Sequence, residues 1–142
     1  MAMRVLVPVD DDERGERAVE LAASLFPDGT VVLFHVINPS EAGFSTEEMI
    51  PSFPDGWYEQ EKARAKELLD DLADMADERG VAVERHVEIG RPARVVLTAV
   101  EKHEIDHVVM GSRGRKGVSR ILLGSIAETV VRRSDVPVTV AR

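Results

Sequence analysis

The chain has 142 residues, of which 44% are hydrophobic and 31% charged, and its formal net charge at pH 7 is −8. This length and composition are typical of one globular domain, residues 1–142, and exclude a wholly disordered chain. The acidic balance argues against nucleic acid or an anionic membrane as a partner, and the absence of cysteine excludes disulfides, thiolate metal sites and cysteine nucleophiles.

The first half of the chain alternates strand and helix patterns. Residues 4–9 (RVLVPV) and 30–37 (TVVLFHVI) are short β-branched apolar runs, as in strands covered on both faces. Residues 13–26 place apolar side chains at helical spacing, and the Pro-Asp-Gly sequence at 27–29 ends that helix. Residues 38–55 contain three prolines and are predicted to form a long loop, and residues 57–79 a long amphipathic helix.

The second half continues the alternation. Residues 81–89 alternate apolar and polar side chains, which predicts a strand near an edge of the sheet. A third helix opens at residues 90–92, a short strand covers 107–110, a fourth helix covers 124–133 and a last strand covers 136–141. This β-α order predicts a parallel sheet with helices on both faces and a ligand site beyond the carboxyl ends of the strands.

The segment from Met110 to Ser125, the glycine segment, has the pattern of a phosphate-binding loop. Two residues separate Gly111 from Gly114, and nine more separate Gly114 from Gly124, where a helix begins. Glycines let backbone amides approach an anion, and a helix N-terminus adds partial positive charge. Between residues 107 and 127 there is no acid but there are four cations, at positions 113, 115, 116 and 120. The spacing matches neither a Walker A motif nor a dinucleotide fingerprint.

With these motifs the sequence resembles the universal stress protein (UspA-like) family. The resemblance rests on Pro8-Val9-Asp10 after the first strand, on LFHVI at 33–37, on the glycine pattern ending at Gly124-Ser125, and on the closing PVTVAR. It implies a single doubly wound domain of the adenine nucleotide alpha hydrolase-like kind, with a five-stranded parallel sheet of strand order 3-2-1-4-5. It also implies binding of ATP, with AMP or ADP as alternatives.

The resemblance assigns a role to each matching position. Asp10 would contact the ribose or lie beside the adenine, Pro8 and Val9 would shape that wall, and the backbone of Val36 would face the adenine edge. The positions implied to lie under the nucleotide or against its phosphates are Met110, Gly111, Arg113, Gly114, Gly124, Ser125, Ile126 and Ala127. No catalytic residue is implied, because no base is evident near the phosphates beyond residues 10–12, so any hydrolysis should be slow.

Asp11 and Asp12 depart from the family, which usually has small residues there. Either these carboxylates point away from the phosphates, or they hold a divalent cation such as Mg²⁺. The interpretation we favour is that one of them caps the following helix.

The remaining polar residues are interpreted as structural. The histidines show no metal spacing, and His35 and His107, which lie in strands, are predicted to be structural. Ser112, like the other hydroxyls near the glycine pattern, is predicted to be an ordinary surface residue.

The leading functional interpretation is a cytoplasmic, nucleotide-dependent regulator of the stress response. The chain lacks a signal-peptide pattern and a stretch long enough for a membrane helix. The β-branched last strand predicts a homodimer that pairs through it. An alternative is a dimeric interaction module of the same fold that binds no nucleotide. A phosphoacceptor receiver domain is disfavoured, because it would need an Asp after the third strand and a Lys after the fifth.

Overall fold

The computed structural model describes residues 2–42, 56–112 and 123–142, and the predicted alternation of strands and helices is confirmed. The elements are β1 (Arg4–Pro8), α1 (Asp12–Leu25), β2 (Thr30–Ile37), the 3₁₀ helix η1 (Pro39–Ala42), α2 (Trp57–Glu78), β3 (Ala82–Ile89), α3 (Pro92–Lys102), β4 (His107–Gly111), α4 (Ser125–Arg133) and β5 (Val138–Ala141). The predicted loop at 38–55 begins with η1, which the sequence did not predict, and residues 43–55 lie outside the described residues.

The last strand is shorter than predicted, beginning at Val138 rather than at Val136. The Ser134 hydroxyl donates to the carbonyl oxygen of Val136 at 2.8 Å, and the Val136 amide donates back to that hydroxyl at 3.1 Å. These local bonds hold residues 134–136 in a turn, so they are withdrawn from the sheet.

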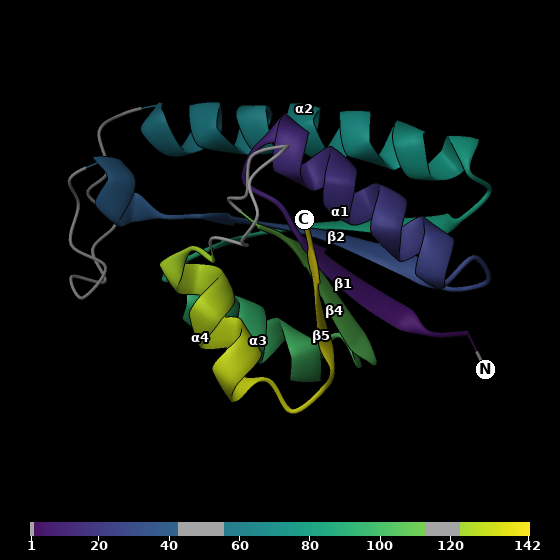
Figure 1. The fold of residues 1–142 in the computed structure, drawn as a ribbon. Helices are drawn as coiled ribbons and strands as arrows, with labels where there is room; N and C mark the ends of the chain where they lie inside the picture. The colour runs from purple at the N-terminus through teal and green to yellow at the C-terminus, as the bar shows by residue number, and fades with distance from the viewer. Residues whose placement is uncertain (1, 43–55, 113–122) are drawn as a thin grey trace.

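The described strands form one parallel sheet in the order β3-β2-β1-β4-β5, as predicted (Figure 1). The register places Leu6 opposite Val32 on one side and opposite Val108 on the other. A crossover connection is needed between parallel neighbours, and the helices provide it. Because β1 lies between β2 and β4, the residues that follow these three strands meet at one edge of the sheet.

Helices α1 and α2 cover one face of the sheet, and helices α3 and α4 cover the other (Figure 1). In β1, Val5 and Val7 pack into the cluster under α1 and α2, whereas Leu6 packs into the cluster against α3 and α4. Both faces of this strand are therefore buried, which is why its sequence is an unbroken apolar run rather than an alternating one.

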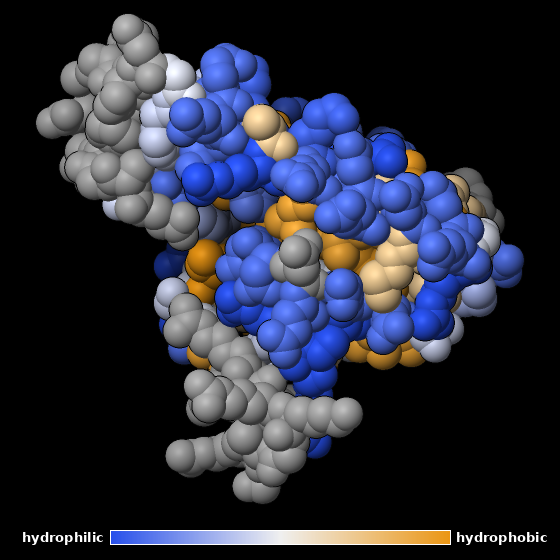
Figure 2. All heavy atoms as spheres, turned by 90° about the horizontal axis from the view of Figure 1, so that it is seen from above, coloured by the Kyte–Doolittle hydropathy of each residue, from blue (hydrophilic) through white to orange (hydrophobic). Residues whose placement is uncertain are grey.

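The strand at 82–89 lies at an edge of the sheet, as its alternating sequence predicted. Arg85 and Val87 are exposed there. Hydrophilic residues also dominate the outer surface over α1 and α2 (Figure 2). No helix in the described part of the chain is long and apolar enough to cross a membrane.

Candidate functional site

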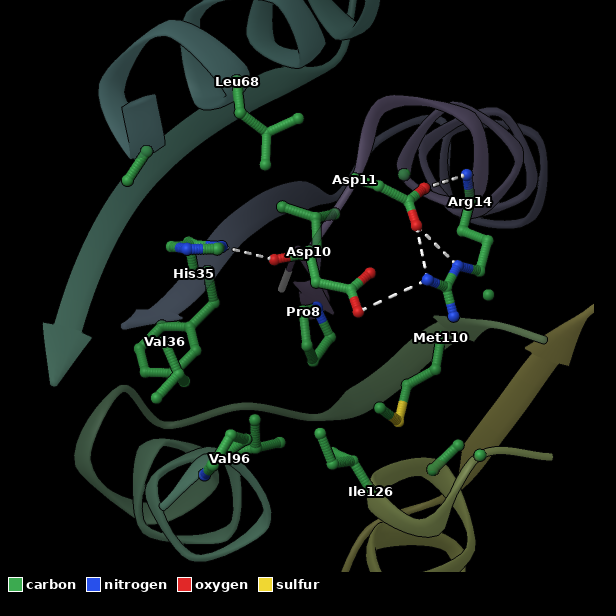
Figure 3. A pocket seen from close by; sticks show the side chains of 18 of the residues that line it. Pro8, Asp10, Asp11, Arg14, His35, Val36, Leu68, Val96, Met110 and Ile126 are labelled. Carbon is green, nitrogen blue, oxygen red and sulfur yellow. Dashed lines mark hydrogen bonds and ion pairs between the residues drawn. The ribbon is translucent and has the colours of Figure 1, made fainter. Parts of the chain in front are cut away.

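A pocket of about 660 Å³ opens at the carboxyl ends of β1, β2 and β4, the edge where ligands bind in parallel α/β sheets (Figure 3). All the predicted site residues that the structure describes line it: Pro8, Val9, Asp10, Val36, Met110, Gly111, Gly124, Ser125, Ile126 and Ala127. Arg113 and Gly114, which complete the predicted set, lie outside the described residues. The fold thus brings together positions that are more than a hundred residues apart in the sequence.

Asp10 and Asp11 lie just beyond β1, after Val9, and have different surroundings. The Asp11 carboxylate caps α1: its Oδ1 accepts from the backbone amide of Arg14 at 2.8 Å. Its Oδ2 accepts from the Arg14 Nε at 2.7 Å. This confirms the cap that we favoured for this pair of acids. Asp10 instead points into the cavity (Figure 3), and its side chain is 64% exposed.

The cap fixes the charge of Asp11. Burial alone would raise the pKa of this carboxyl group, but the hydrogen bonds from the Arg14 amide and guanidinium outweigh burial and hold the pKa below its ordinary value. The same contact raises the pKa of Arg14. Both groups are therefore charged at neutral pH. Asp11 is thereby engaged by the protein itself, which disfavours the alternative that it holds a cation.

The described part of the chain offers no ready-made metal centre, since no three His, Asp or Glu side chains within it are grouped to hold an ion. The side chain of Asp12 is not among those described.

Arg14 is a pocket residue that the sequence did not reveal. It lies in the first turn of α1, four residues after Asp10, and its Nη2 is 3.6 Å from the Asp10 Oδ2. The available signal was this i, i+4 spacing of opposite charges. This spacing indicates a contact between Asp10 and Arg14 only if the helix starts close beyond the strand, which the sequence alone does not show.

His35 lies on β2 and also lines the pocket. Its Nδ1 is 2.8 Å from the carbonyl oxygen of Val9. A carbonyl only accepts, so this nitrogen carries the proton and, in the neutral ring, Nε2 is an acceptor. The predicted structural role of His35 is therefore borne out by this bond, and the ring contributes to the cavity wall as well.

Helices α2 and α3 supply walls that the sequence analysis did not include. Leu68 and Ala65 lie on the apolar side of α2, the amphipathic helix, and Pro92 and Val96 come from α3. Leu68 packs against the core cluster and borders the pocket as well. A single apolar stripe can serve both purposes, and periodicity alone does not separate them.

The start of the glycine segment is held firmly. Ser112 is only 1% exposed, so its prediction as a surface hydroxyl was wrong. Its amide donates to the carbonyl oxygen of Ala141 at 2.9 Å, and its own carbonyl oxygen accepts from the Arg17 guanidinium at 3.0 Å. Strand β5 and helix α1 therefore fix the point from which the segment departs.

The opposite side of the pocket is the first turn of α4. Gly124 is the N-cap residue, in an extended conformation and without a capping side-chain hydrogen bond. The first amides of a helix have no acceptor within it, so they can donate to an anion. Ser125 is exposed beside them. This turn is the part of the described pocket best suited to phosphate.

The described lining is otherwise acidic. It contains five carboxylates and two guanidiniums: Asp10, Asp11, Glu61, Glu67, Asp71, Arg14 and Arg64. An acidic wall suits groups that donate hydrogen bonds, such as hydroxyls, and repels phosphate. A ligand with a neutral, hydroxyl-bearing part and an anionic part would thus be oriented, with its anionic part toward α4.

Comparison with known proteins gives one family. The model described as "Universal stress protein family" matches residues 1–142. Universal stress protein MJ0577 of Methanocaldococcus jannaschii is 28% identical over 159 residues, a match that covers 100% of this chain and 96% of that protein. Its solved structure superposes with a TM-score of 0.79 over 99% of this chain and 96% of the other.

Two further comparisons are more partial. Universal stress protein MJ0531 of the same organism is 38% identical over 81 residues, and this match covers 57% of this chain and 48% of that relative. The solved universal stress protein of Archaeoglobus fulgidus in complex with dAMP has a TM-score of 0.73 over 99% of this chain and 98% of that one. At 20% identity it shows a common fold.

Proposed function

Because this chain belongs to the universal stress protein family, we propose that it is a cytoplasmic regulatory protein that binds an adenine nucleotide, ATP in the first place, in the pocket at the carboxyl ends of β1, β2 and β4. The observation that carries the proposal is the convergence of residues from β1, β2, β4 and α4 on one cavity. The dAMP complex of the Archaeoglobus protein adds support for an adenine nucleotide as the ligand class.

The nucleotide would lie with its ribose near Asp10, whose carboxylate accepts hydrogen bonds from hydroxyls. Its adenine would lie beside Val36, and its phosphates would approach the first turn of α4 together with the cations of the glycine segment. Mg²⁺ would enter with the triphosphate, since the described residues hold no group of three metal ligands.

Binding rather than turnover is proposed. Asp11 is engaged by Arg14, and the pocket cations and glycines account for holding a nucleotide. The alternative function, an interaction module that binds no nucleotide, was favoured by the unusual acids at positions 11 and 12. Its support is weaker now that Asp11 has a capping role.

The experiment is native mass spectrometry of the purified protein, followed by calorimetric titration with ATP, ADP, AMP and GTP. The proposal predicts a co-purified or added adenine nucleotide at one per chain and a clear preference for adenine over guanine. Absence of binding by all three adenine nucleotides would contradict it.

A further inference from the structure

One guanidinium joins the two acids that follow β1. Arg14 Nη2 is 2.5 Å from the Asp11 Oδ2 and 3.6 Å from the Asp10 Oδ2. Figure 3 shows the three side chains together at the edge of the pocket, with the guanidinium between the carboxylates. Arg14 is thus shared between a residue that caps a helix and a residue that faces the cavity.

Arg14 is held from two sides. Asp11 accepts both from its backbone amide and from its Nε, so the side chain and the main chain are bound to one carboxylate. The end of β4 packs against it as well, because a Cβ at Gly111 would come within 2.9 Å of the Arg14 carbonyl oxygen. The guanidinium therefore occupies a defined position relative to the strand ends.

Asp10, in contrast, has a largely exposed carboxylate, 64% of whose side-chain surface is accessible. A short side chain in that situation samples several rotamers unless a partner selects one. The carboxylates of Glu61, Glu67 and Asp71 line the same pocket and repel that of Asp10. The guanidinium of Arg14 offsets that repulsion and attracts the carboxylate toward one position.

We propose that Arg14 is a positioning residue for Asp10: held by Asp11, it keeps the Asp10 carboxylate aimed into the pocket, where that carboxylate reads the ribose hydroxyls of the bound nucleotide. The inference rests on the proposed function, and it goes further by assigning ribose recognition to a chain of three residues. Asp11, the unusual acid in this segment, would then support nucleotide binding by holding Arg14 in place.

The competing role for Arg14 is direct contact with phosphate, as any pocket cation could provide. The two roles differ in what they predict. A positioning residue affects ligands that carry ribose hydroxyls, whereas a phosphate ligand affects ligands according to their number of phosphates.

The test is a titration of ATP, 2′,3′-dideoxy-ATP and adenosine into wild type, Arg14→Gln, Arg14→Lys and Asp11→Asn. The measured quantity is the ribose preference, the Kd for dideoxy-ATP divided by the Kd for ATP. We expect Arg14→Gln to lower this ratio by roughly two- to five-fold, the size of one partly exposed charge contact, with the Kd for dideoxy-ATP unchanged. Arg14→Lys should restore part of the ratio, because it keeps the charge but loses the fork.

Asp11→Asn keeps a capping oxygen but removes the negative charge that binds the Arg14 guanidinium, so it should also lower the ribose preference. This second variant tests the inference even if Arg14→Gln folds poorly. The matched control is Arg79→Gln, which removes an arginine that pairs with Glu20 of α1 at 3.0 Å and does not line the pocket. Its ratio should equal that of wild type.

Three results would overturn the inference while leaving the proposed function intact. They are an unchanged ratio in Arg14→Gln and Asp11→Asn, an equal loss for ATP and dideoxy-ATP, and a loss that is larger for ATP than for adenosine. Wild-type protein that binds none of the three ligands would instead overturn the proposed function, and this inference with it.

Discussion

A Cβ atom at Gly111 would lie 2.9 Å from the carbonyl oxygen of Arg14 and 3.0 Å from its Cβ. The end of β4 and the first turn of α1 therefore pack at a distance that only glycine permits, since backbone atoms cannot swing aside as the tip of a side chain can. This contact sets the width of the pocket between the strand that leads into the glycine segment and the helix that carries Arg14.

Gly111→Ala should push β4 and α1 apart and lower the free energy of unfolding by about 2 to 3 kcal/mol, in the upper part of the range for overpacking. Urea denaturation at neutral pH measures the loss. Gly80→Ala is the control, because Gly80 has open space around it and a φ of +74°, so its cost is backbone strain of about 1 kcal/mol. A Gly111→Ala variant no less stable than Gly80→Ala would show that the close approach is not constraining.

An ion pair ties the beginning of β1 to β3 across β2. Arg4 donates to both oxygens of Glu84, at 2.6 and 3.1 Å, and its Nε donates to the carbonyl oxygen of His103 at 2.8 Å. The hydrogen bond from Arg4 lowers the pKa of Glu84 from 4.5 to about 2. Because the folded-state pKa is depressed, the stabilisation is present above pH 4.5 and is lost as the pH falls toward 2.

Glu84→Gln should accordingly lower the free energy of unfolding at pH 7 by about 1 kcal/mol, a value reduced for solvent screening because 40% of the Glu84 side chain is exposed. The difference from wild type should shrink between pH 4.5 and 2. The control is Glu128→Gln, which breaks the exposed pair with Arg132 on α4 and should cost at most about 0.5 kcal/mol. Stability curves for wild type and Glu84→Gln that stay parallel down to pH 2 would contradict this account.

Two histidines should make the fold sensitive to mild acid. Burial lowers the pKa of His103, and the neighbouring His86 ring, whose centroid is 4.2 Å away, and Lys102 lower it further, against an opposing effect of Glu88. Burial also lowers the pKa of His107. The unfolded chain then binds protons that the folded chain resists, so stability should be full above pH 6.5 and should decline as the pH falls below it.

The measurement is the urea midpoint at pH 7.5 and at pH 5, for wild type and for the His103→Gln, His107→Gln double variant. The double variant should show a smaller decline between the two pH values than wild type. An equal decline would assign the acid sensitivity to other groups.

The predicted dimer through β5 can be tested by proline substitution. The amide of Val108 donates to Pro137, and that of Ser112 donates to Ala141, so the odd-numbered residues of β5 face β4. In a parallel ladder the even-numbered residues then direct their amides outward.

Val138→Pro removes one outward donor and should convert dimer to monomer in light scattering, with the fold kept. Thr139→Pro removes an inward donor and should lower stability instead. A wild-type monomer, or an unchanged dimer in Val138→Pro, would contradict the prediction.

The topology followed from patterns that depend on single elements. The unbroken apolar run around Leu6 predicted a strand buried on both faces, and the alternation around Arg85 predicted an edge. The helix cap could be narrowed to Asp11 or Asp12 because capping is decided within one helical turn, and the structure identifies Asp11.

The features that were missed depend on contacts between distant segments. Ser112 is buried because Ala141 and Arg17, far away in the sequence, take up its backbone groups. Leu68 of α2 borders the pocket because the fold brings it close to residues of β1 and β2 that are far away in the sequence. Neither local propensity nor periodicity carries this information, so these residues become evident only when the sheet order and helix positions are known.

The most direct test of the central claim is the calorimetric titration of ATP into wild type and into Gly114→Val and Gly124→Val. Valine at either position would block the close approach of backbone amides to the phosphates. Circular dichroism should show each variant folded like wild type. The account predicts saturable ATP binding by wild type and its loss in both variants. An affinity for ATP that is the same in all three proteins would contradict it.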